Sequence, residues 1–92
     1  MAVLNSEQLK ERTANLPDWQ IEAGELVRIF HFNDFRQALD FVNRVGQAAE
    51  TAAHHPDIDI RYNRVRLALI THDAGGLTEK DFALAAQANG LA

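Results

Sequence analysis

Apolar residues recur along this chain with two different spacings, and each spacing predicts a different kind of element. Between Phe35 and Ala52 they return every three or four residues, which is typical of an amphipathic helix. On either side, the segment 19–32 is rich in β-forming residues, and over 58–70 apolar and polar residues alternate with a period of two, as they do in strands. The pattern therefore predicts a long central helix between two hairpins.

The central helix has recognisable start and stop signals. Asn33 or Asp34 can cap its first turn, and Pro56 stops it. Its apolar side chains should form one stripe that faces a sheet. The residues of this stripe are Phe35, Leu39, Val42, Val45, Ala49 and Ala52.

Turn residues divide the flanking segments into strands. We expect Ala23-Gly24-Glu25 to turn the first hairpin and Asn63-Arg64 to turn the second. The four strands then cover roughly 19–21, 26–32, 58–62 and 65–70.

Two shorter helices complete the chain. Ser6 can cap a helix over 6–14, and Pro17 closes it off. After the strand-breaking Gly75-Gly76, Thr78 with Asp81 resembles a capping signal for a last helix.

Two hairpins separated by a helix favour an α+β fold with the order α-β-β-α-β-β-α. The economical packing is a single four-stranded antiparallel sheet with three helices on one face. No linker or repeat interrupts the chain, so residues 1–92 should form one domain. Because the uncovered face and the edge strands would expose Ile, Val and Phe, we expect a dimer that extends the sheet.

Composition excludes several classes of function. A formal net charge of −4 over 92 residues disfavours direct binding of nucleic acid, which demands clustered Lys and Arg. The local basic cluster, Arg61, Arg64 and Arg66, is interpreted as a solvated strand edge. The absence of cysteine rules out disulfides, thiol nucleophiles and thiolate metal sites. Since neither a signal peptide nor a membrane span is evident, a cytoplasmic location is expected.

Three of the four histidines lie at the ends of predicted elements around the second hairpin. His54 and His55 follow the central helix, and His72 follows the last strand. With Asn63-Arg64 as the turn, antiparallel pairing places His55 opposite His72. Glu50 lies four residues before His54, so the two side chains should share one helix face. A carboxylate and three imidazoles are therefore predicted to meet at one mouth.

Imidazoles suit proton transfer near neutral pH, because the ordinary histidine pKa of about 6.5 leaves both protonation states available. Acid–base chemistry without a metal or a covalent nucleophile is the class that we favour. An alternative makes Glu50, His54 and His72 a metal site with two histidines and one carboxylate, although their spacing matches no specific metal motif.

Seven chemically distinctive residues stand in a fixed order between positions 50 and 81. The segment Glu50-Thr-Ala-Ala-His54-His55-Pro56 is followed after five residues by Tyr62, after nine more by His72 and after eight more by Asp81. This arrangement resembles the signature of the pterin-4a-carbinolamine dehydratase family. Leu16-Pro-Asp-Trp19, the segment 30–35 and Thr71-His-Asp also look like landmarks of that family, so the resemblance covers essentially the whole chain.

The resemblance implies a hydro-lyase that needs neither cofactor nor metal. Its substrate would be 4a-hydroxytetrahydrobiopterin, the pterin-4a-carbinolamine, and its products quinonoid dihydropterin and water. Such an enzyme supports tetrahydropterin recycling after an aromatic amino-acid hydroxylase. The resemblance also implies the antiparallel sheet with helices on one face, and a homodimer or a dimer of dimers.

Site residues follow from the same resemblance. His54 and His72 would be the catalytic proton-transfer pair, and His55 would assist by orienting the substrate. Asp81 would cap the last helix or support the site without touching substrate. The residues expected to bind the pterin are Glu50, His54, His55, Pro56, Thr71, His72 and Asp73.

Two alternative functions keep this fold. Animal members of the family also act as dimerisation cofactors of a homeodomain transcription factor, a role that would use a helix surface and not the histidines. The other alternative keeps the dehydratase chemistry but changes the substrate to a molybdopterin-related pterin.

Overall fold

The structure, a computed structural model, describes residues 2–92. Its elements confirm the predicted order α-β-β-α-β-β-α, with one added turn of 3-10 helix, η1, before the last helix. They are α1 (Ser6–Ala14), β1 (Gln20–Glu22), β2 (Glu25–His31), α2 (Phe35–Ala52), β3 (Asp57–Arg61), β4 (Arg64–Leu69), η1 (His72–Ala74) and α3 (Glu79–Leu91).

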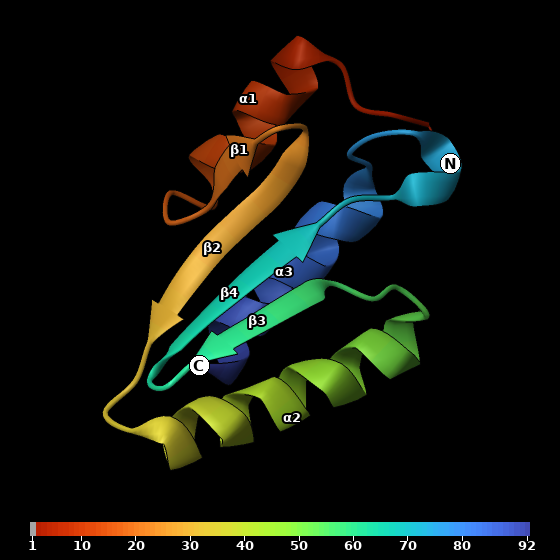
Figure 1. Cartoon of the computed structure of the whole chain (residues 1–92). Coiled ribbons are helices and arrows are strands. Elements are labelled where there is room, and N and C mark those ends of the chain that lie inside the picture. The colour runs from red at the N-terminus through yellow and green to blue at the C-terminus, as the bar shows by residue number, and fades with distance from the viewer. Residues whose placement is uncertain (1) are drawn as a thin grey trace.

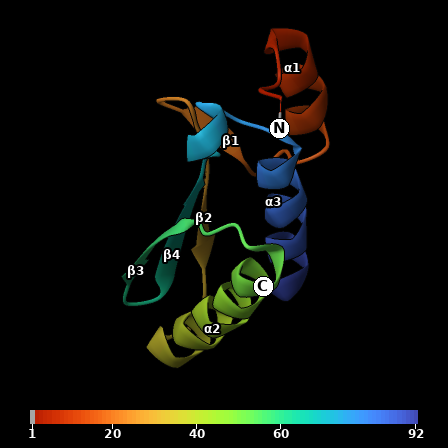
Figure 2. The ribbon, with the colours of Figure 1, turned by 90° about the vertical axis from the view of Figure 1, so that its right-hand side faces the viewer.

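The four strands form one antiparallel sheet in the order β1-β2-β4-β3. The central pair, β2 and β4, joins the two hairpins, and the edges of the sheet are the short β1 and β3 (Figure 1). All three helices lie on the same side of the sheet, which leaves its other face open (Figure 2). This arrangement confirms the predicted α+β fold.

The core lies between the sheet and the helices. Leu26 and Phe30 of β2 and Val65, Leu67 and Leu69 of β4 point into it and are almost completely buried. Alternation along each strand sends one set of side chains inward and the other outward.

Aromatic side chains fill the centre of this core. Phe41 of α2 packs against Phe30 and Phe32, with ring centroids 4.6 Å and 5.0 Å away. Trp19 meets Phe30 edge-on at 5.9 Å, and its indole N–H donates to Asn89 Oδ1 at 2.8 Å. The buried tryptophan thus has a hydrogen-bond partner for its N–H and an aromatic neighbour for its ring.

The buried stripe of α2 differs from the predicted one. Phe35 and Leu39, which were expected to face the sheet, are 46% and 42% exposed. The apolar surface of α2 is wider than the strip that the sheet covers, and Phe41 sets which part is buried. The buried residues are Ala38, Phe41, Val45, Ala48 and Ala49.

The open face of the sheet also differs from the prediction. Phe30 points into the core and Phe32 packs on it, so phenylalanine does not cover the open face. Ile29 is the large apolar side chain that β2 exposes there, at 47%. The neighbouring outward positions of β3 and β4 are mostly charged.

The turn of the second hairpin lies one residue earlier than predicted. Arg61 pairs with Arg64, so Tyr62 and Asn63 form the turn, and Tyr62 adopts a positive φ of 51°. Asn63 ties this turn to the end of β2, because its side chain donates to the Phe32 carbonyl at 3.0 Å. The strand register is consequently shifted by two residues.

Candidate active site

The histidines gather where α2 ends, β3 begins and β4 ends. A shallow pocket of about 190 Å³ lies there. The predicted site residues that line it are His54, His55, Thr71, His72 and Asp73, and sequence reasoning missed Ala53, Ile70 and Lys80. Lys80 could have been found by its position, since it stands beside the signature residue Asp81.

A left-handed turn after α2 brings His54 into this pocket. The helix ends at Ala52, and Ala53 takes φ 52° and ψ 39°, with its backbone N–H donating to the Ala49 and Glu50 carbonyls. The N–H of His54 also donates to the Ala49 carbonyl, at 3.1 Å. This pattern terminates helices by satisfying their last carbonyls. The prediction that Glu50 and His54 share one helix face is therefore wrong, because His54 lies beyond the end of α2.

His54 is held by Asp81 of α3. Its Nε2 lies 2.6 Å from Asp81 Oδ1, and the side chains are 11% and 0% exposed. The other carboxylate oxygen, Oδ2, accepts the Thr71 hydroxyl at 2.8 Å and the Thr78 backbone N–H at 2.9 Å. Asp81 thus caps α3 and supports His54 at the same time, which combines the two roles considered for it.

The direction of every hydrogen bond in this cluster follows from its donors. Since the Thr71 hydroxyl gives its hydrogen to Asp81, its 2.8 Å contact with the Thr78 hydroxyl is one that Thr78 donates. The Thr78 hydroxyl oxygen in turn accepts the Lys80 backbone N–H at 3.3 Å. Within residues 2–92, no buried side-chain nitrogen or oxygen lacks a partner.

These hydrogen-bond directions determine which nitrogen of the His54 ring carries the hydrogen. A carboxylate only accepts hydrogen bonds, so the hydrogen between Asp81 and His54 lies on Nε2. In the neutral ring, Nδ1 is then the basic nitrogen, which can accept a further proton. A buried carboxylate that orients an imidazole in this way also stabilises the imidazolium after it accepts a proton.

His55 has a different partner and a different environment. Its Nε2 contacts Glu50 Oε2, and both side chains are largely exposed, at 62% and 77%. Glu50 therefore pairs with His55 and not with His54 as expected. Such an exposed pair can hold an imidazole over the pocket but stabilises the fold little.

His72 does not lie opposite His55 as predicted. In the observed register, extending the pairs beyond β3 would place His55 opposite Ile70, two residues before His72. His72 opens the 3-10 turn η1, which Gly75 ends in a left-handed conformation with φ 79°. The Thr71 N–H donates to the Gly76 carbonyl at 3.2 Å, so the base of this loop is closed. The exposed imidazole reaches the pocket from this loop.

Other residues of the signature lie away from the pocket. Pro56 does not line it, and Glu50 reaches it only through His55. Tyr62 stands at the far end of the hairpin and is 66% exposed.

The alternative metal site is not assembled. In the part of the chain that the structure describes, no three His, Asp or Glu side chains are arranged so that they could hold a metal ion. Glu50, His54 and His72 therefore do not form the ligand set considered from the sequence. None of the helices within residues 2–92 is long and apolar enough to cross a membrane.

The pocket thus combines a buried carboxylate, an imidazole fixed by it and two exposed imidazoles, an arrangement that can accept and donate protons. Residues 2–91 match the family model described as pterin 4 alpha carbinolamine dehydratase. The chain belongs to this family.

Similar proteins agree with that family over their full length. A protein of Acidobacterium capsulatum, provisionally assigned as a pterin-4-alpha-carbinolamine dehydratase, is 58% identical over 91 residues, which are 99% of each chain. A second relative with the same provisional assignment, from Chloroflexus aurantiacus, is 60% identical over 86 residues, covering 94% of this chain and 92% of the relative.

Solved structures share the fold. The crystal structure of a transcriptional coactivator/pterin dehydratase from Brucella melitensis superposes with a TM-score of 0.94 at 34% identity, over 98% of both chains. A pterin dehydratase-like protein described as a RuBisCO assembly factor in the alpha-carboxysome gives 0.65 at 24% identity, over 79% of this chain and 84% of its own. The second likeness concerns the fold alone.

Proposed function

We infer that this protein dehydrates a pterin-4a-carbinolamine, with 4a-hydroxytetrahydrobiopterin as substrate. The observation that carries the proposal is the hydrogen bond between His54 and the buried Asp81, which leaves Nδ1 as the basic nitrogen of an imidazole that lines the pocket. Membership of the family supports the same substrate class.

The reaction needs two proton transfers and no electron transfer. The bond between C4a and its hydroxyl oxygen breaks, and that oxygen leaves as water after gaining a proton. N5 loses its proton, and its electron pair forms the double bond to C4a of the quinonoid dihydropterin. One group must therefore act as an acid and another as a base.

His54 and His72 fit these two roles. His54 is largely shielded from solvent and is oriented and supported by a carboxylate, which suits the base that takes the N5 proton. His72 stands exposed on η1 at the pocket, where an imidazolium could protonate the leaving oxygen. His55, held by Glu50, would orient the pterin, and the backbone of Thr71 and Asp73 would meet the polar edge of its ring.

The wider setting follows from the chemistry. A 4a-carbinolamine is the product of an aromatic amino-acid hydroxylase, so the protein would act after such an enzyme in the cytoplasm and return the pterin to a reductase. A homodimer or a dimer of dimers would cover Ile21 and Ile58 on the edge strands, which are 41% and 38% exposed.

A second candidate function is that of a protein-binding cofactor. The Brucella melitensis relative is described as a transcriptional coactivator as well as a pterin dehydratase. In this chain, Phe35 and Leu39 are exposed on α2. They would supply the helix surface that such a role requires, separate from the histidines.

An absorbance assay tests the enzymatic proposal. An aromatic amino-acid hydroxylase generates the 4a-carbinolamine, and its dehydration is followed with and without the purified protein. We expect the protein to accelerate the decay in proportion to its concentration. A decay equal to that in buffer would leave the binding role as the better account.

A further inference from the structure

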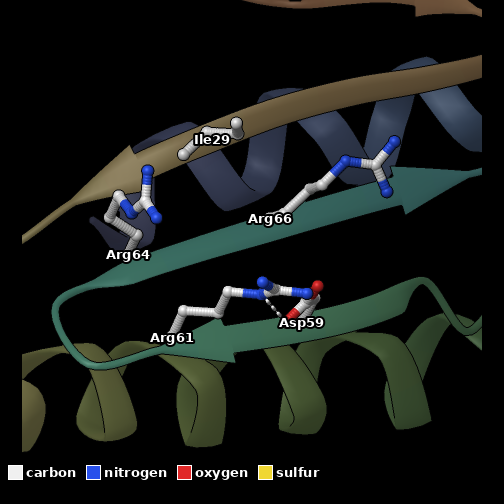
Figure 3. Close-up of a pocket in the computed structure, with 5 residues that line it drawn as sticks. All are labelled: Ile29, Asp59, Arg61, Arg64 and Arg66. Atoms are coloured by element: carbon white, nitrogen blue, oxygen red, sulfur yellow. Dashed lines mark hydrogen bonds and ion pairs between the residues drawn. The ribbon is translucent and has the colours of Figure 1, made fainter.

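Two arginines face each other at the turn end of the second hairpin. Arg61 of β3 and Arg64 of β4 are direct partners in the sheet, and Arg66 follows two residues along β4 on the same face. Figure 3 shows the three side chains on the open side of the sheet, around Ile29 of β2 (Figure 3). Like charges directly opposite each other destabilise a sheet.

Carboxylates in this region neutralise the cluster only in part. Arg61 Nε lies 3.3 Å from Asp59 Oδ1, and Arg66 Nη2 lies 3.8 Å from Glu22 Oε1. Arg64 has no carboxylate within ion-pair distance among residues 2–92. Within this described part of the chain, Arg64 is therefore the arginine of the cluster whose charge is left without a carboxylate partner.

The arginines surround a shallow pocket of about 240 Å³. Its walls are the side chains of Ile29, Asp59, Arg61, Arg64 and Arg66. Ile29 offers an apolar surface between the guanidinium groups, and Asp59 closes one side. This pocket shares no residue with the histidine pocket.

We propose that this arginine pocket binds a small molecule that carries a diphosphate group. Paired positions in the sheet hold their Cα atoms about 5 Å apart, and positions two residues along a strand are about 7 Å apart. Long arginine side chains at these spacings can reach one ligand that spans the pocket. Guanidinium groups pair with phosphate oxygens through two parallel hydrogen bonds, which gives them geometric specificity.

The spacing of the guanidinium groups favours a diphosphate over an anion with one charged group. Arg64 and Arg66 stand two residues apart on β4 and on either side of Ile29 (Figure 3), so each of two linked phosphoryl groups can pair with one of them. The modest volume excludes large anions from the pocket itself. The diphosphate can be free pyrophosphate or part of an ester. An ester would place its organic group against Ile29 or outside the open side of the pocket.

The arginine and histidine pockets lie at opposite ends of the β3–β4 hairpin. His55 precedes β3 and His72 follows β4, whereas Arg61 and Arg64 flank the turn. The five residues of β3 separate the two ends by about 16 Å. The proposal therefore does not rest on the dehydratase activity.

Calorimetric titration of the full chain tests the proposal. Inorganic pyrophosphate, inorganic phosphate and a nucleoside diphosphate are titrated into the wild type, Arg64→Ala and Arg36→Ala. Arg36 lies exposed at the start of α2, so its removal changes the net charge equally without touching the pocket. Circular dichroism confirms that each variant is folded.

We expect saturable binding of one pyrophosphate per wild-type chain, tighter than binding of phosphate. Arg64→Ala should weaken it by about tenfold, as loss of a charge-assisted contact does, while Arg36→Ala leaves it unchanged. Asp59→Asn should tighten it, because this change releases Arg61 from its carboxylate. Tighter binding of the nucleoside diphosphate than of pyrophosphate would identify an ester as the ligand.

Three results would overturn the proposal. One is the lack of saturable pyrophosphate binding at millimolar concentration. Another is equal weakening by Arg64→Ala and Arg36→Ala, which would show a general effect of net charge. The third is a change of sedimentation on Arg64→Ala without pyrophosphate binding to the wild type, which would assign this face to an interface between copies of the chain.

Discussion

His54 donates a hydrogen bond of 2.6 Å to Asp81, a carboxylate that is completely buried and 27 residues away in the sequence. Two further donors, the Thr71 hydroxyl and the Thr78 backbone N–H, hold that carboxylate in place. The imidazole at the mouth of the pocket is consequently oriented by the cap of the last helix.

Replacing Asp81 should disturb this imidazole before it disturbs anything else in the pocket. In Asp81→Asn, the amide can present a donor to His54, so we expect Nε2 to lose its hydrogen and Nδ1 to carry it. Nitrogen NMR of His54 reads this change of tautomer directly. Glu79→Gln removes an acid from the same turn of α3 and should leave the His54 spectrum unchanged.

The same Asp81→Asn change should also lower the free energy of unfolding. With its nitrogen toward His54, the amide still offers an oxygen to the Thr71 hydroxyl and the Thr78 backbone N–H. A neutral amide oxygen accepts these hydrogen bonds more weakly than a carboxylate does, by about 1 kcal/mol each. Urea denaturation measures this loss. An unchanged midpoint together with an unchanged His54 tautomer would contradict the network described above.

The exposed pair of Glu50 and His55 should affect substrate binding, and it should contribute little to the stability of the fold. We expect Glu50→Gln to raise KM several-fold with kcat nearly unchanged, since His55 would lose its orienting partner. Unfolding free energy should change by less than about 1 kcal/mol, as is usual for exposed pairs. A fall in kcat with KM unchanged would instead place Glu50 in the chemical step.

Phe41 should be the most sensitive apolar position of α2. It is 0% exposed and packs on two other rings, so Phe41→Ala should lower the unfolding free energy by about 3–5 kcal/mol. Leu39→Ala, on the exposed side of the same helix, should cost far less. Comparable losses for the two variants would contradict the observed orientation of α2.

An ion pair between α1 and α3 should make stability depend on pH. Arg12 Nε donates to Glu79 Oε1 at 2.9 Å, and this hydrogen bond lowers the pKa of Glu79 below its ordinary value of 4.5. A lowered carboxyl pKa stabilises the folded state above the ordinary value, and that stabilisation is lost as the pH falls through the folded-state pKa.

Glu79→Gln should therefore be less stable than the wild type at neutral pH, and the difference should vanish in acid. Urea titrations of both proteins at neutral pH and well below 4.5 measure this. A difference that persists in acid would mean that Glu79 acts through something other than its charge. Glu79 is exposed and Arg12 is partly exposed, so the effect should be small and should decrease with added salt.

Local patterns in the sequence predicted the elements well because each element has a regular period. The hairpin register was wrong by two residues for a specific reason. Tyr62 takes a left-handed conformation that bulky residues rarely adopt, so Asn63-Arg64 looked like the better turn. The side chains still point to the expected faces, because a shift of two residues preserves the alternation.

Tertiary packing determines the hydrogen-bond partners of the site residues, which the sequence did not reveal. The signature placed His54, His55, His72 and Asp81 in one list, but their partners depend on how α2 ends and where α3 docks. A left-handed Ala53 removes His54 from the helix face that it would share with Glu50. Asp81 then becomes its neighbour across the core.

The dehydration rate of the 4a-carbinolamine tests the central claim most directly, in wild type, His54→Ala, His72→Ala and a matched control. His31→Ala is that control, since His31 is exposed at the end of β2 away from the histidine pocket. Acid–base catalysis by a positioned side chain contributes about 10²–10⁴-fold, so His54→Ala and His72→Ala should lose activity on that order while His31→Ala retains it. Equal rates for all four proteins would contradict the assignment of the histidines.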